Sequence, residues 1–76
     1  MQADTIQGYR GRVVELTFLD GARIRARIIS VDPEQLDNHV VYEVLEVRAP
    51  GPDPDIWKRT PLASSAQRIA DVQPAD

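Results

Sequence analysis

The sequence predicts a single small all-β domain: a five-stranded, strongly bent barrel with a short N-terminal helical turn. Three observations predict this fold. Apolar and polar residues alternate before the dipeptide Asp20-Gly21, a second run mixing apolar residues with arginines follows it, and residues 39–48 (HVVYEVLEVR) are rich in β-branched side chains. A chain of 76 residues has room for one domain only. Closure into a barrel would also remove the exposed edges of so small a sheet.

The side chains around Asp20-Gly21 indicate the register of the first hairpin. A two-residue loop would pair Phe18 with Arg23 and would mix apolar with charged side chains on each face. A three-residue loop, Leu19-Asp20-Gly21 with the glycine in the left-handed conformation, pairs Phe18 with Ala22 instead. We therefore predict the longer loop, which leaves the arginines on one face. The opposite, apolar face then consists of Val14, Leu16, Phe18, Ile24 and Ala26.

The first half of the chain contains three further predicted features. In the N-terminal segment 1–11, Asp4 or Thr5 could cap one helical turn that Gly8 or Gly11 ends. The second strand continues to Val31, and neighbouring apolar residues before that point break the alternation, which predicts a bend or bulge. Residues 39–48 form the long third strand, so the 32–39 segment is the connecting loop.

The second half is divided by its prolines. Residues 49–55 (APGPDPD) contain three prolines and predict an exposed loop without regular structure. We predict a short fourth strand at 56–59, a loop with one tight helical turn at 61–67, and a closing strand at 69–73. Residues 74–76 are expected to be a frayed tail.

Composition narrows the classes of function. The net charge is −3 and the isoelectric point is near 5.0, which argues against a general nucleic-acid coat. The absence of cysteine excludes disulfides and fits a reducing compartment. His39 is the single histidine and has no ligand spacing around it, so we expect no metal or other cofactor. No signal peptide and no membrane-spanning run is evident, and we expect a cytoplasmic protein. Because the core is thin, self-association is a plausible source of stability.

The stretch from Val13 to Val44 resembles the first signature block of the Sm-like family. The matching features are the alternation in the first strand, the Asp20-Gly21 turn, Ile28 and Asp32, and Asn38 lies close to the position of the family's base-contacting asparagine. The resemblance implies a bent, five-stranded, SH3-like barrel behind a short helix, and rings that bind single-stranded RNA. The family's second signature, an Arg-Gly pair, is missing, and Arg68-Ile69 is its nearest counterpart.

Two sets of residues are candidates for RNA binding. Arg23, Arg25 and Arg27 share one face of one strand at a spacing of about 6.5–7 Å. They could follow a phosphate backbone, or they could form a solvated face balanced by Glu15 and by Glu43 or Glu46. The resemblance also implies that the loop carrying Asp32, Asn38 and His39 lines a ring pore, where His39 would stack on a base and Asn38 would read its edge. Arg68 is a further candidate for nucleic-acid binding. The alternative is that Asp32, Asn38 and their neighbours are turn residues.

Trp57 is the largest apolar side chain in the sequence. It could form an aromatic platform with Tyr9 or Tyr42. A lone tryptophan in so small a domain is more often a core or interface anchor, so we predict that it packs the proline loop or meets a neighbouring subunit.

No nucleophile motif is present, and Ser64-Ser65 has no evident activating base, so we expect a protein that is not an enzyme. The predicted function is an Sm-like protein that binds single-stranded RNA as a homo-oligomeric ring. The alternative is a protein-protein interaction or assembly module on the same barrel, with no nucleic-acid role.

Overall fold

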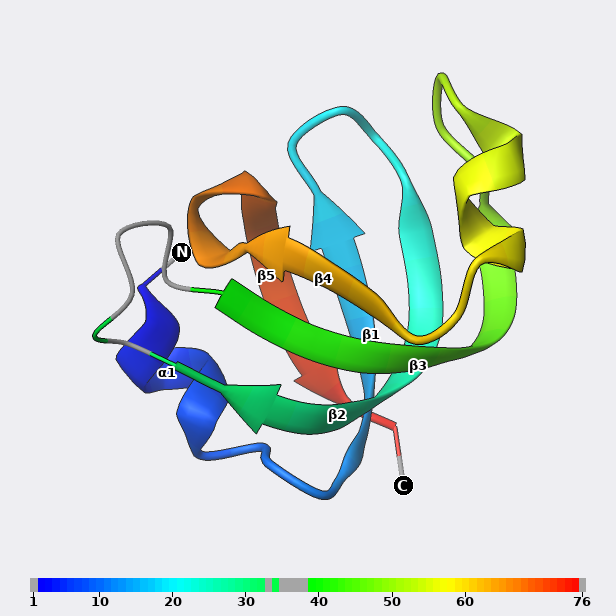
Figure 1. Cartoon of the computed structure of the whole chain (residues 1–76). Helices are drawn as coiled ribbons and strands as arrows, with labels where there is room; N and C mark the ends of the chain where they lie inside the picture. Colours follow the sequence, from blue (N-terminus) through cyan, green and yellow to red (C-terminus); the bar gives the residue numbers. More distant parts are fainter. Residues whose placement is uncertain (1, 33, 35–38, 76) are drawn as a thin grey trace.

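The computed structural model describes residues 2–32, 34 and 39–75. Its helical elements are α1 (Ala3–Gln7) and two 3-10 helices, η1 (Pro54–Lys58) and η2 (Ala66–Arg68). Its strands are β1 (Val13–Phe18), β2 (Arg23–Val31), β3 (His39–Ala49), β4 (Leu62–Ser65) and β5 (Ile69–Pro74). The five strands form one antiparallel sheet in the order β4-β3-β2-β1-β5 (Figure 1). The predicted small all-β fold with an N-terminal helical turn is confirmed.

The first hairpin has the predicted register. Leu16 lies opposite Ile24, and Val14 lies opposite Ala26. The amide of Phe18 donates to the carbonyl of Ala22 at 2.8 Å, and Gly21 has a φ of 96°, which glycine adopts without strain. The carboxylate of Asp20 accepts the Ala22 amide at 3.0 Å and holds the turn. The three-residue loop therefore sorts apolar side chains to the inside and arginines to the outside.

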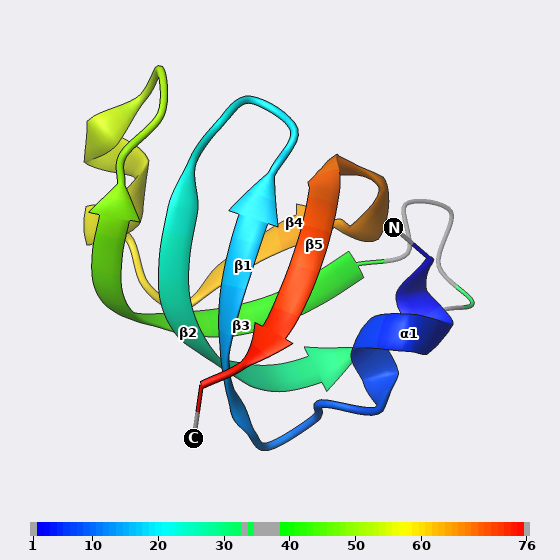
Figure 2. The ribbon, with the colours of Figure 1, turned by 180° about the vertical axis from the view of Figure 1, so that it is seen from behind.

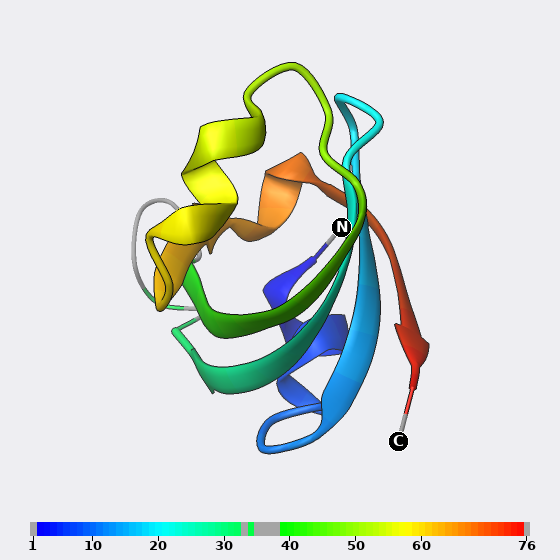
Figure 3. The same ribbon diagram turned by 90° about the vertical axis from the view of Figure 1, so that its right-hand side faces the viewer.

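The sheet curls because β2 and β3 bend sharply (Figure 3). The register of β2 against β3 shifts between Ile28 and Ser30, so that Ile29 is an extra residue whose side chain is 43% exposed. The bulge predicted from the broken alternation is confirmed. Beyond it, the end of β2 reaches α1, which packs against β2, β3 and η2 (Figure 2).

The core lies on the concave side of the sheet. It contains all five residues of the predicted apolar face and is completed by side chains of α1, β3, η2 and β5. The buried apolar residues are Ala3, Ile6, Val14, Leu16, Phe18, Ala22, Ile24, Ala26, Ile28, Val40, Tyr42, Ala66, Ile69 and Val72. Both buried residues of α1, Ala3 and Ile6, face this core, so the short helix is held by packing.

The prediction for the helix cap was wrong. The N-cap is Gln2, which makes no side-chain cap, and Asp4 lies in the first turn, where a carboxylate is favoured by the helix dipole. Gly8 ends the helix, as predicted.

The predictions for residues 49–67 were partly wrong. The proline loop is shorter than expected, because Ala49 still belongs to β3 and Pro54 already begins η1. Residues 56–59, expected to be a strand, lie in and just after this 3-10 helix, whose start suits proline because its first residues need no amide donor. The fourth strand is Leu62–Ser65, which was expected to be a loop. The predicted tight helical turn is present as η2, which begins inside the predicted loop 61–67 and ends one residue beyond it.

The C-terminal strand is confirmed, but the expected frayed tail was wrong for residues 74 and 75. Pro74 lies opposite Val14 in the sheet, and the amide of Ala75 donates to the carbonyl of Val13 at 3.0 Å. Proline is tolerated there because β5 is an edge strand.

Candidate binding pocket around Trp57

The predicted row of Arg23, Arg25 and Arg27 lies along β2 on the outer face of the sheet. Arg23 forms an ion pair with Glu15 at 2.8 Å, and Arg25 donates to the carbonyl of Ala75 at 3.5 Å. Three glutamates on the neighbouring strands lie opposite members of the row: Glu15, Glu43 and Glu46. The three arginines are therefore matched by the glutamates that the sequence suggested would balance them.

The loop between β2 and β3 is described only at its ends and at Glu34. The amide of Asp32 donates to the carbonyl of His39 at 2.9 Å, and the carboxylate of Asp32 accepts the amide of Glu34 at 3.0 Å. His39 opens β3 and lies opposite Ser65. Asn38, the predicted base-contacting residue, lies outside the described residues. The structure thus brings Asp32 and His39 together at the base of the loop, where Asp32 has the contact of a turn residue.

A pocket of about 260 Å³ lies at the other end of the sheet. The β1–β2 loop, η1 and η2 surround it, and all three lie at the upper end of Figure 1. Its aromatic lining consists of Phe18, Tyr42 and Trp57. The Phe18 ring lies 5.5 Å from Trp57 and 6.2 Å from Tyr42 between ring centroids, so the three rings form one cluster.

Trp57 ties the proline segment to this cluster. Its indole N–H donates to the carbonyl of Pro50 at 2.8 Å, and Pro50 and Pro52 line the pocket beside it. The prediction that Trp57 packs the proline loop is confirmed. Of the two tyrosines suggested as its partner in an aromatic platform, Tyr42 lines the pocket with Trp57. Tyr9 lies instead beneath Arg12, whose guanidinium carbon is 5.5 Å from the ring centre.

The floor of the pocket is polar. The hydroxyls of Tyr42 and Ser64 share a hydrogen bond of 2.7 Å, and Ser64, Asp20 and Arg68 all line the space around it. Burial raises the pKa of the Tyr42 hydroxyl, while the hydrogen bond to Ser64 and the charge of Arg68 oppose that rise and Asp20 adds to it. Arg68 and Asp20 therefore both lie within electrostatic reach of this hydroxyl pair.

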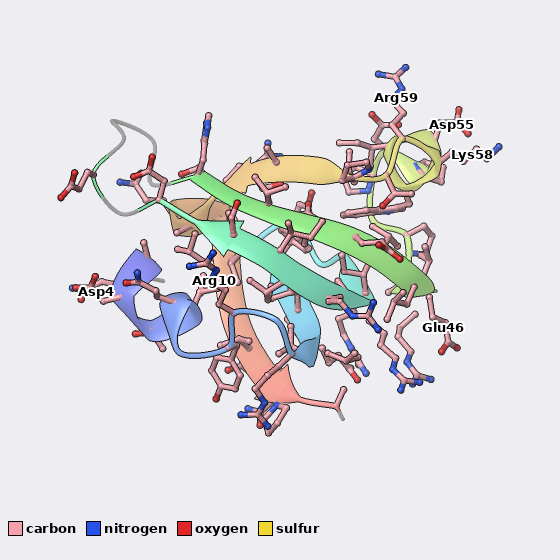
Figure 4. The ribbon with its side chains drawn as sticks, turned by 60° about the horizontal axis from the view of Figure 1, so that its bottom comes forward. Asp4, Arg10, Glu46, Asp55, Lys58 and Arg59 are labelled. Atoms are coloured by element: carbon pink, nitrogen blue, oxygen red, sulfur yellow. The ribbon has the colours of Figure 1, made fainter. Side chains whose placement is uncertain are left out.

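Arg68 is the cation of the pocket. Lys58 and Arg59 project into solvent from the region of η1 (Figure 4), and Lys58 pairs with Asp55 at 3.5 Å. Among the described residues that line the pocket, Arg68 is the only basic one, and Asp20 and Asp53 are the acidic ones. The structure thus places Arg68, predicted as an RNA-binding residue, together with Trp57.

Two further observations concern metal binding and membrane-spanning helices. No group of three or more His, Cys, Asp or Glu side chains that could hold a metal ion occurs within the ranges that the structure describes. In the same ranges, none of the helices has the length and apolar character needed to cross a membrane.

Comparison of the chain with models of protein families, with curated proteins and with solved structures gave no match. The resemblance to the Sm-like family stays a prediction.

Sequence reasoning identified Trp57 and Arg68 but missed that they share a site. It also missed Asp20, Ser64 and Phe18 as lining residues, because the fourth strand and η1 were misplaced. One signal was available: the proline-rich segment precedes the only tryptophan, and a segment that loops back could bring that indole onto the end of the first hairpin.

Proposed function

We propose that this chain is a protein-interaction module without enzymatic activity, and that the Trp57 pocket is its binding site. The observation that carries the proposal is the gathering of Trp57, Tyr42 and Arg68 around one surface pocket. Tryptophan, tyrosine and arginine are the residue types most enriched among the side chains that dominate protein interfaces. A space of about 260 Å³ is smaller than the roughly 300–1,000 Å³ that encloses a drug-sized ligand, and it suits one anchoring side chain.

The charge distribution favours this proposal over a nucleic-acid role. RNA affinity depends on arginines and lysines that neutralise phosphates. The net charge is −3, and glutamates face the arginine row on both sides. We keep the cytoplasm as the proposed location, which the absence of cysteine supports.

The test is a displayed library of random twelve-residue peptides, selected on the full-length protein. We expect enriched peptides whose binding weakens at least about tenfold in Trp57→Ala, because that variant removes the wall of the pocket. Ile29→Ala is the matched control, since Ile29 is also apolar and partly exposed but lies on the β2 bulge. Circular dichroism must show that both variants are folded.

Failure to enrich any peptide, or enrichment of peptides that bind folded Trp57→Ala as tightly as the parent protein, would contradict the proposal. If Trp57→Ala is unfolded, Ile56→Glu replaces it, because Ile56 lines the same pocket but is only half-buried.

A homo-oligomeric ring that binds single-stranded RNA is the second candidate, and the strand order supports it. The sheet ends at β4 on one side and β5 on the other, and neither edge has a second partner strand within the described part of the chain. Two different edges favour head-to-tail contacts, which close into rings when the rotation allows. In such a ring Arg27 and His39 would contact the RNA.

Native mass spectrometry and titration of a fluorescent uridine-rich oligonucleotide at two salt concentrations test this candidate. The ring model predicts an oligomer and an affinity that falls with salt, with further loss in Asn38→Ala/His39→Ala. A monomer whose affinity does not respond to salt would exclude it.

A further inference from the structure

We propose that the floor of the Trp57 pocket binds the side-chain carboxylate of an aspartate or glutamate in a partner protein. Arg68 would hold this carboxylate, and an apolar side chain next to it in the partner would lie against Trp57. The inference rests on the proposed function and names the chemistry of the partner.

Arg68 supplies a guanidinium to the lining of the pocket. It lines the pocket and acts on the Tyr42 hydroxyl, yet no hydrogen bond or ion pair joins it to another side chain in the described ranges. The pair of Arg23 and Glu15, by contrast, is formed within the chain. A guanidinium offers a planar set of donors that matches a carboxylate with two parallel hydrogen bonds.

The hydroxyl pair of Tyr42 and Ser64 offers a further hydrogen-bond donor. The bond between Tyr42 and Ser64 uses one of their two hydroxyl hydrogens. Tyr42 is 1% exposed whereas Ser64 is half-buried and lines the pocket, so when Tyr42 donates, the Ser64 hydrogen is free for an incoming acceptor. Ser64 and Arg68 together then provide donors to an oxygen ligand.

The acidic residues of the pocket are less suited to bind a cation. One oxygen of Asp20 already accepts the Ala22 amide and holds the hairpin turn. Asp53 is the N-cap of η1 and belongs to the proline segment rather than to the strands that carry Tyr42 and Ser64. A C-terminal carboxylate is usually captured by several backbone amides. The donors here are side chains, which favours an acidic side chain within a segment.

Replacing Asp20 tests whether the pocket binds a negative or a positive charge. The charge of Asp20 opposes a bound carboxylate and would attract a bound cation. Asp20→Asn removes the charge and keeps an oxygen that can accept the Ala22 amide. The variant should therefore bind an acidic peptide about two- to fivefold more tightly, and a basic peptide more weakly.

The experiment uses peptides from the library described above, in which each peptide is fused at its C-terminus and offers no free terminal carboxylate. We expect enriched peptides to carry Asp or Glu beside an apolar residue. Fluorescence anisotropy then compares each acidic peptide with its Asn or Gln form. Arg68→Gln should weaken the acidic peptide roughly 10- to 100-fold and change the amide form less than about twofold. Arg10→Gln, at an exposed arginine that does not line the pocket, is the matched control and should change neither.

The outcomes separate the two proposals. Peptides that need Trp57 but lack acidic residues, or that bind Arg68→Gln unchanged, overturn the carboxylate inference and leave the interaction module standing. The same holds for peptides that Asp20→Asn weakens. An absence of any Trp57-dependent peptide overturns the proposed function itself.

Discussion

Phe18→Ala is expected to lower the free energy of unfolding by about 3–5 kcal/mol, the range for removing a buried aromatic ring. Phe18 is 7% exposed, and its ring joins Tyr42 to Trp57. Because small domains are stable by only about 5–15 kcal/mol, we expect the variant to be partly or wholly unfolded at 37 °C. Urea denaturation followed by Trp57 fluorescence measures the change.

Leu19→Ala is the control for this prediction. Leu19 is the next residue in the chain and is 72% exposed at the tip of the hairpin, so its loss should change stability by less than about 0.5 kcal/mol. A Phe18→Ala protein that unfolds within about 1 kcal/mol of the parent would show that the aromatic cluster does not hold the pocket end of the sheet.

Gly51→Ala is expected to destabilise the protein by about 2–4 kcal/mol, from a left-handed backbone and an overpacked contact. Gly51 has a φ of 72°, and a Cβ atom there would lie 2.9 Å from the Cβ of Ala22, which is fully buried. The proline segment rests on the hairpin at this point. Thermal unfolding of the variant and its parent measures the effect.

Two variants separate the two causes. Gly11 has a φ of 81° and open space at its Cβ position, so Gly11→Ala should show only the backbone effect, about 1–2 kcal/mol. Adding Ala22→Gly to Gly51→Ala removes the contacting methyl group. If Gly51→Ala and Gly11→Ala are equally destabilised, the close approach of Gly51 to Ala22 does not contribute.

The sequence was most informative where side-chain pattern and turn chemistry agreed. In the first hairpin, alternation and the Asp20-Gly21 turn both pointed to one register, and a one-residue error would have inverted both faces. Residues 62–65 (LASS) carried no such signal. Alanine and serine have little preference for strands, and this strand exists because it pairs with the buried half of β3.

The candidate site depended on strand pairing of this kind, which carries no local sequence signal. Trp57 and Arg68 come from η1 and η2, which are too short to be predicted from periodicity. Ser64 belongs to the unpredicted β4. The sequence therefore indicated which side chains carry chemistry, but their meeting depends on long-range pairing between β3 and β4.

The hydrogen bond from the Trp57 indole to the Pro50 carbonyl closes a ring of chain whose two ends are fixed. Pro52, Asp53 and Ile56 lie inside that ring and line the pocket, yet they are not part of the sheet. Their identities can change without altering strand pairing, since loops tolerate substitution better than the elements that they connect. The closed segment is thus an exchangeable unit, through which the same five-stranded sheet could carry pockets with different linings.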